Sequence, residues 1–236
     1  MSALSADPQG VLTVTAPAVF GQIHLVPAVM SFMQRYPRIE IDLNLTDEIL
    51  DLAVHRVDVA IRISKLPDSD LIASRLAPFE RVVCASPHYL ENFGWPATPM
   101  DLLQHNCLVL KRKPLIVPGC WSFAGINRHQ PLAVSGNLRS NDINFLLRAA
   151  IEGAGIVHLA SWLVSEAVTS GKLVNLFPDA QPTPAKIQPA IHAVRMPGRS
   201  HAAKAQLFIT HLREVFGQPA YWDRAISMVL KSGVHL

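Results

Sequence analysis

Alternating strand and helix patterns in the first 64 residues constrain the fold more than any other feature of this sequence. A strand pattern over residues 10–16 is followed by apolar residues at steps of three and four over 24–36, which is typical of a helix with one buried face. Residues 39–45 alternate between apolar and polar, as do residues 57–63, and both alternations predict strands. Between these two strands we predict a further helix over residues 49–55. This order predicts a parallel sheet with helices on its faces.

A second α/β region follows the first. Asn141 and Asp142 precede an apolar helical pattern over residues 143–151, and Gly153 is placed to close that helix. A short buried strand is predicted over residues 156–160, before another helix. The Pro- and Gly-rich region between residues 93 and 135 favours short strands and turns.

The end of the chain returns to the first region. Residues 187–196 are predicted to form a strand, and an apolar stripe over residues 203–216 predicts an amphipathic helix. We therefore expect two α/β lobes with a cleft between them, joined where the chain crosses twice. The expected boundaries are residues 1–9 for the end of a linker, 10–80 plus 188–216 for lobe I, 81–187 for lobe II and 217–236 for a C-terminal tail.

Composition excludes several classes of protein. Half of the residues are hydrophobic and 17% are charged, which is typical of a folded globular chain. The 21 basic and 18 acidic side chains give a net charge of +3, too small for a nucleic-acid-binding surface. The first ten residues do not resemble a secretory signal, and three cysteines without C-x-x-C spacing favour free thiols in a reducing compartment. We therefore expect a cytoplasmic protein with no membrane partner.

Known catalytic and metal-binding motifs are missing from the sequence. There is no H-E-x-x-H, G-x-S-x-G or phosphate-binding loop, and His105 and Cys107 have no second pair at ligand spacing. A redox pair of Cys107 and Cys120 is a lesser alternative, because nothing in the sequence lowers the pKa of either thiol. We expect no catalytic residues, no metal and no cofactor.

Short polar residues instead gather where strands are predicted to end. They lie at Thr15–Pro17, Thr46–Asp47, Arg62–Lys65 and Ser140–Asp142, with His158 on a later strand. Ligands of such sheets bind at the carboxyl ends of strands, where helix N-termini present free N–H groups that favour a small anion. Each segment taken alone is equally well explained as a helix cap or turn. Their coincidence favours a binding site.

These segments carry a family resemblance. The runs G-V-L-T-V-T-A-P at residues 10–17, R-Y-P-R-I-E-I-D-L at 35–43 and D-V-A-I-R-I at 58–63 resemble the effector-binding domain of LysR-type transcriptional regulators. So do V-V-C-A-S-P-H-Y-L at 82–90 and A-A-I-E-G-A-G-I-V at 149–157. The resemblance extends over nearly the whole chain, from about residue 10 to residue 216.

The resemblance implies a fold like a type 2 periplasmic binding protein: two Rossmann-like lobes joined by two crossing strands, with an effector cleft between them. It implies effector contacts at Thr15, Pro17, Thr46, Ile63, Ser64, Lys65, Ser140, Asn141 and His158. It also implies an isologous homodimer, with contacts at Leu25, Val29, Met33, Ile39, Ile41 and Leu43.

The winged helix-turn-helix that precedes this domain in the family is missing here. We therefore expect a piece of a longer regulator that contacts DNA only through the missing part and that forms a dimer or, at full length, a tetramer. Two alternatives use the same fold. A solute-binding protein of a transporter would carry an export signal, and an enzyme would need catalytic groups in the cleft.

Overall fold

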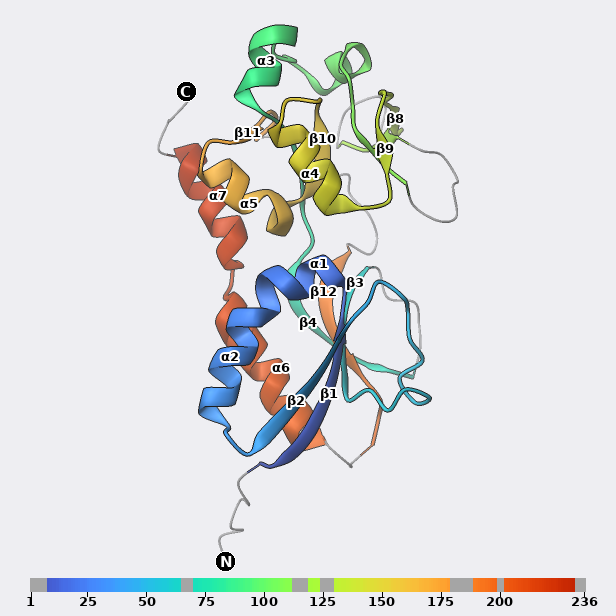
Figure 1. The fold of residues 1–236 in the computed structure, drawn as a ribbon, viewed down its shortest axis with the longest axis vertical. Coiled ribbons are helices and arrows are strands. Elements are labelled where there is room, and N and C mark those ends of the chain that lie inside the picture. The colour runs from blue at the N-terminus through green and yellow to red at the C-terminus, as the bar shows by residue number, and fades with distance from the viewer. Residues whose placement is uncertain are drawn as a thin grey trace, which may run out of the picture. The chain divides into compact units, whose positions relative to one another are not determined.

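The computed structural model describes residues 8–64, 70–111, 119–123, 130–178, 189–198 and 202–231 (Figure 1). The chain divides into two compact units. Unit 1 comprises Met1–Phe79 with Ile187–Ala220, and unit 2 comprises Glu80–Lys186 with Tyr221–Leu236. The chain therefore passes between the units three times, whereas two passages were expected from the sequence. The region expected as a separate tail is divided between the units.

Unit 1 is built on a five-stranded sheet in the order β2-β1-β3-β12-β4. The strands are β1 (Gly10–Ala16), β2 (Ile39–Leu45), β3 (Val59–Ser64), β4 (Ile72–Pro78) and β12 (Ala190–Arg195). The first three run parallel, as the alternating pattern predicted, while β12 is antiparallel to both of its neighbours. Their carboxyl ends therefore meet at one edge of the sheet.

Helices cover this sheet. Helical structure begins directly after β1, as α1 (Ala18–Phe20), a π-helical turn (Gly21–Leu25) and α2 (Val26–Arg35). It starts six residues earlier than the predicted range of 24–36. Helix α6 (Ala202–Phe216) packs against α2 and β4, as the apolar stripe near the end of the chain indicated.

The helix predicted over residues 49–55 is wrong, because this segment forms turns. The Asp51 carboxylate accepts hydrogen bonds from the backbone amides of Ala53 and Val54, at 2.8 and 3.1 Å. Such a local bond stabilises a turn in competition with a continuing helix. Arg56 then takes a left-handed φ of 51°, which also interrupts a helix.

Unit 2 has smaller, mixed sheets. In its three-stranded sheet, β5 (Arg81–Ala85) lies between β10 (Val157–Ala160) and β11 (Val174–Asn175), antiparallel to both. Two further pairs are β6 (Val109–Leu110) with β9 (Arg139–Ser140), and β7 (Cys120–Trp121) with β8 (Leu132–Ala133). The helices are α3 (Pro87–Phe93), a 3-10 helix (Pro99–Gln104), α4 (Ile143–Ile151), α5 (Ser161–Thr169) and α7 (Tyr221–Lys231).

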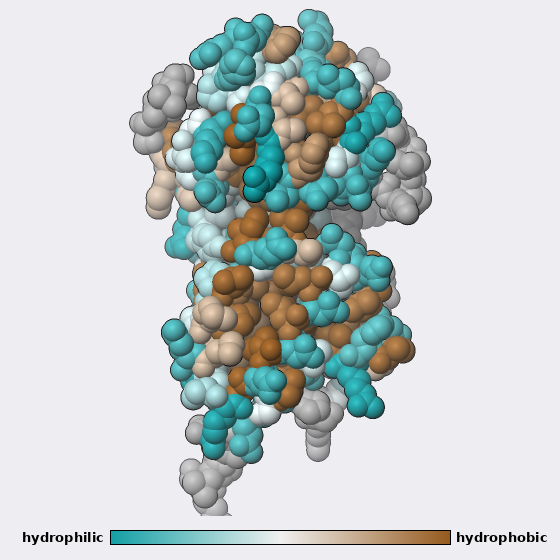
Figure 2. All heavy atoms as spheres, viewed as in Figure 1, coloured by the Kyte–Doolittle hydropathy of each residue, from teal (hydrophilic) through white to brown (hydrophobic). Residues whose placement is uncertain are grey.

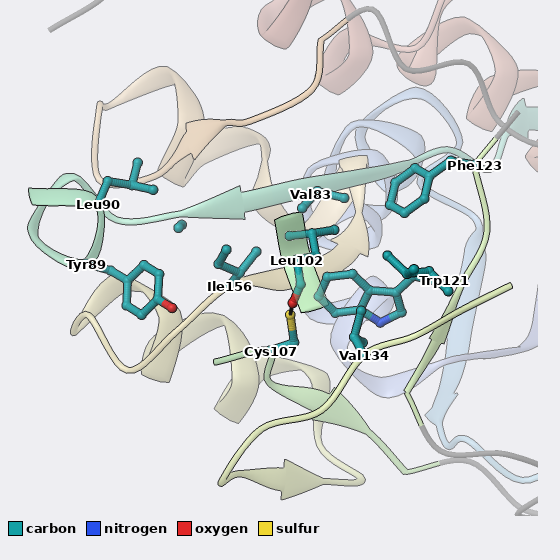
Figure 3. Close-up of a cluster of buried hydrophobic side chains, with 11 residues drawn as sticks. Val83, Tyr89, Leu90, Leu102, Cys107, Trp121, Phe123, Val134 and Ile156 are labelled. Carbon is teal, nitrogen blue, oxygen red and sulfur yellow. Dashed lines mark hydrogen bonds between the residues drawn. The ribbon is translucent and has the colours of Figure 1, made fainter. Parts of the chain in front are cut away.

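Unit 2 has an apolar core cluster to which β5, α3, the 3-10 helix, β7, β8 and neighbouring loops contribute (Figure 3). Cys107 lies in it and donates its Sγ–H to the Leu102 carbonyl at 3.5 Å. Burial raises the pKa of the Cys84 and Cys107 thiols to about 12, so both stay protonated. Cys120 is free and exposed. The buried, protonated Cys107 thiol offers little support for the alternative of a Cys107–Cys120 redox pair.

Candidate functional site

Strand register brings the first two predicted segments together at the edge of the unit 1 sheet. β1 and β2 are parallel, with Thr15 beside Asn44 and Ala16 beside Leu45. The Thr46 amide then donates a hydrogen bond to the Ala16 carbonyl at 2.9 Å. Thr15, Pro17 and Thr46 are therefore neighbours, although they are separated by some thirty residues of sequence.

The third segment extends from the same edge. β3 pairs with β1 up to the Thr15–Ala60 position, so Ile63 and Ser64 continue beyond that pairing and lie opposite Ile191 and Ala190 of β12. Ile63 is half-buried and Ser64 is exposed. Lys65, also predicted as a contact, falls outside the described residues.

The hydroxyl groups at this edge differ in how accessible they are. Thr15 is only 6% exposed. Thr46 is half-buried, and its Oγ1 already accepts a bond from the Glu48 amide at 3.1 Å, while its own O–H remains a donor. The edge therefore offers hydroxyl donors and acceptors to a polar ligand.

A carboxylate occupies the helix N-terminus beside this edge, whereas the sequence indicated only a helix cap at this position. Asp47 Oδ1 accepts a hydrogen bond from the Ala18 amide, the first of α1, at 3.2 Å. That N–H group was expected to be free for an anion. Its use by Asp47, and the negative charge of Asp47, remove one argument for an anionic ligand.

The predicted segment in unit 2 has the same design. Ser140 ends β9, and its Oγ accepts a bond from the Asp142 amide at 3.0 Å. Asp142 is the N-cap of α4 and accepts from the Phe145 amide at 2.9 Å. Asn141, between them, is exposed. Here too a carboxylate lies at the helix N-terminus and occupies one of its N–H groups, which weakens the argument for an anion at both expected sites.

His158 lies in β10, and its described contacts are aromatic. Its ring is stacked on Phe123 at 5.7 Å and tilted against Trp121 at 5.3 Å between centroids. Among the described residues, its buried Nδ1 has no hydrogen-bond partner. Desolvation, with a smaller effect of Arg81, lowers the pKa of His158 to about 3. The ring is therefore neutral at physiological pH and supplies no charge to an anion.

The predicted dimer contacts are partly wrong. Leu25 of the π-helical turn, Val29 of α2 and Ile39 of β2 are all buried in the core of unit 1, so their side chains are not available to a partner. Met33 is exposed, and Ile41 and Leu43 on β2 are half-buried. The large apolar side chains exposed on this helical segment are Ile23, Val26, Met30 and Met33. Figure 2 shows apolar residues gathering on the surface over α2 and β2.

Sequence reasoning missed or misjudged three features of the site. Asp47 was noted only as a helix cap, and the helix it actually caps is α1. Lys111, whose amide donates to the Ser140 carbonyl at 2.7 Å, directly follows residues 108–110, where a short strand was expected, but it was not considered part of the site. Trp121 and Phe123, which pack on His158, lie in the Pro- and Gly-rich region between residues 93 and 135. Only their residue type, two aromatic side chains two positions apart, was a signal that could have found them.

Comparison with known proteins identifies the family. The model of the LysR substrate binding domain matches residues 5–217. The chain is 33% identical over 177 residues to the HTH-type transcriptional activator TtdR of Escherichia coli K12, covering 75% of this chain and 56% of that protein. It is 30% identical over 218 residues to the HTH-type transcriptional regulator PtxR of Pseudomonas aeruginosa, covering 92% and 68%.

A solved structure supports the same family assignment. The regulatory domain of CrgA, a LysR-type transcriptional regulator from Neisseria meningitidis, is similar with a TM-score of 0.76 and 29% identity, covering 89% of this chain and all of that one. The chain is an effector-binding domain of a LysR-type regulator. It belongs to the LysR substrate-binding family, with its α/β fold of the type 2 periplasmic-binding-protein kind, and spans about half the length of relatives such as TtdR. Among the described residues, no helix is long and apolar enough to cross a membrane.

Proposed function

We propose that this chain senses a small molecule for a transcriptional regulator, through one half-site in each unit. The half-site in unit 1 consists of Thr15, Pro17, Thr46 and the end of β3, and the half-site in unit 2 consists of Ser140 and Asn141. The observation that carries the proposal is the convergence of polar residues from β1, β2 and β3 on one sheet edge. In α/β sheets of this kind that edge is where ligands bind.

The available groups suit a polar effector. Hydroxyl and amide side chains bind by hydrogen bonds and favour no particular charge. Asp47 and Asp142 oppose an anion at either helix N-terminus. The anionic effector expected from the sequence therefore stays a prediction that the binding experiment must decide. Because the named relatives are transcriptional regulators, we favour a sensor that releases its ligand unchanged over an enzyme or a solute-binding protein.

The proposed partners of this chain follow from its membership of the LysR family. We propose that the chain acts within a longer cytoplasmic regulator that contacts DNA through a separate helix-turn-helix segment, since the relatives are longer and are named HTH-type regulators. We also propose a homodimer formed through the exposed apolar face of α2, which consists of Val26, Met30 and Met33, together with β2. Apolar side chains gathered on one face are typical of a protein interface.

Thermal unfolding with paired ligands tests the proposal. Each carboxylic acid in a panel of small metabolites is compared with its neutral amide, because a ligand at about 100 times its Kd stabilises the folded state by about 2.7 kcal/mol. A shift with acids alone supports an anionic effector, and a shift with amides supports a neutral one. No shift with any compound in a broad panel contradicts a small-molecule sensor.

Variants then locate the site for any compound that binds. We expect Thr15→Val and Asn141→Ala each to weaken binding by about 1–2 kcal/mol, the cost of one unmade hydrogen bond. Thr13→Val is the matched control, because Thr13 lies on the same strand and the same face but two residues further from the strand end than Thr15. Unchanged affinity in both site variants would place the ligand elsewhere.

A further inference from the structure

The end of the chain connects the two units a third time. Helix α6 belongs to unit 1 and ends at Phe216, whereas α7 belongs to unit 2 and begins at Tyr221 (Figure 1). Only Gly217–Ala220 lie between them. The match to the family model ends at residue 217, so α7 lies beyond the residues that the family model describes.

Helix α6 is firmly attached within unit 1. Phe216 at its end is fully buried and packs edge-on against Phe20 of α1, with 5.9 Å between ring centroids. His211 Nε2 lies 2.8 Å from the Ser31 hydroxyl of α2. Glu214 forms an ion pair with Arg35, at the end of α2, at 2.8 Å. These contacts fix the C-terminal half of α6, including its last turn, against α1 and α2.

Helix α7 is equally well attached within unit 2, where it packs on α5. Trp222 is 1% exposed and Ile226 is 6% exposed. The buried Ser165 hydroxyl of α5 donates a hydrogen bond to the Trp222 carbonyl at 3.0 Å. Helix α7 is thus an integral part of unit 2 and not a loose tail.

The connection between these two anchors is short. Four residues span at most about 14 Å when fully extended. Ala220 is itself buried, and the Gly217 amide is bonded to the Arg213 carbonyl at 3.0 Å, so part of the segment is already held in place. The connecting segment therefore has little spare length to accommodate a change in the arrangement of the units.

We infer that α6, Gly217–Ala220 and α7 form a tether that limits the relative movement of the two units. The link with sensing rests on the proposed function, in which an effector binds a half-site in each unit. The tether itself requires no ligand. Any movement of unit 2 that exceeds the reach of the tether pulls on α6 and must disturb its contacts with α2, the helix whose exposed side chains form the proposed dimer face.

Distance measurements between spin labels test the tether. One label replaces Ala53 in unit 1 and the other replaces Glu91 in unit 2, both exposed, in a Cys120→Ser background where the two remaining cysteines are buried. Inserting Gly-Ser-Gly-Ser between Gly217 and Gln218 lengthens the tether. The same insertion between Pro197 and Gly198, in an exposed turn of unit 1, is the matched control. Dilution with unlabelled protein removes distances between molecules.

We expect the tether insertion to broaden the distance distribution by up to about 10 Å, the root-mean-square reach of four flexible residues, and the control insertion to leave it unchanged. Hydrogen exchange checks that residues 221–231 stay protected in the lengthened chain. The tether would be overturned if the distance distribution kept its width while α7 stayed protected from exchange. It would also be overturned if the control insertion broadened the distribution equally, or if α7 lost its protection in the lengthened chain. Because no effector is used, failure of the ligand screen leaves this result unaffected.

Discussion

A single carboxyl group on α7 makes the stability of unit 2 depend on pH. Asp223 is half-buried, and desolvation raises its pKa to about 6, with a further upward effect from Glu80. The side chains of Ser161 and Trp222 oppose this shift. Because the folded pKa lies above the unfolded value, protonated Asp223 favours the folded state, and this contribution is lost as pH rises through about 6.

Replacing this group should therefore stabilise the protein at neutral pH only. We expect Asp223→Asn to raise the free energy of unfolding at pH 7.5 by about 1–2 kcal/mol, less than the full linkage value because solvent screens a half-buried group. At pH 4 the variant and the parent should differ little. Denaturant unfolding at both pH values measures this, with Glu166→Gln, an exposed carboxyl on α5, as the control. The same offset at both pH values would contradict the assignment.

His158 has the opposite dependence. Its folded pKa of about 3 lies below the ordinary value, so the unfolded chain binds a proton that the folded chain excludes. Stability from this group is present above about pH 6.5 and falls as the pH is lowered towards 3.

An aromatic replacement should remove this dependence. His158→Phe retains a ring against Trp121 and Phe123 but has no group to protonate. Between pH 7 and pH 5, we expect the free energy of unfolding to fall by up to about 2 kcal/mol more in the parent than in this variant. Asp223 titrates in both proteins and cancels from the comparison. Denaturant unfolding gives the two slopes, and His88→Phe at an exposed site is the control. Equal pH dependence in His158→Phe and the parent would show that His158 is solvated.

At the scale of elements, the periodic patterns of apolar residues predicted the ends of several strands and helices. β1 and β2 have the predicted ends, and α4 begins after Asp142 and closes at Gly153, whose φ of +83° is easily adopted only by glycine. The segment at 49–55 failed because apolar spacing does not show that Asp51 bonds the next amides. Of the dimer contacts that the family resemblance implied, Leu25, Val29 and Ile39 are buried within unit 1. Periodicity identifies the buried stripe of α2, whereas a dimer uses the apolar side chains left outside it.

The exposed stripe of α2 gives a direct test of the dimer. Met30 is 51% exposed, and we expect Met30→Glu to shift the protein from dimer to monomer, because a charge at the interface must be desolvated. Light scattering across a concentration series measures the change. Met228→Glu makes the same substitution at a methionine that is 67% exposed on α7 and should leave the dimer intact. A parent protein that is already monomeric, or a Met30→Glu variant that remains dimeric, would argue against this face.

At the scale of the whole molecule, local pattern and family resemblance predicted the class of fold and the sheet edge at which the proposed half-site of unit 1 lies. Parallel strands place their carboxyl ends on one edge, so Thr15, Thr46 and Ser64 converge from sequence order alone. The third passage between units was not predicted, because a helical pattern near the end of the chain does not show which unit it packs on. The same limit applies to His158, since a polar residue in a strand does not reveal its aromatic neighbours.

The central claim is that one small molecule engages polar groups in both units. Hydrogen exchange followed by mass spectrometry, with and without any compound that raises the unfolding temperature, tests it most directly. We predict simultaneous protection of peptides containing Thr15–Pro17 and Thr46 in unit 1 and Ser140–Asn141 in unit 2, with peptides from α3 unchanged. Protection confined to one unit, or protection that omits these strand ends, would contradict the account.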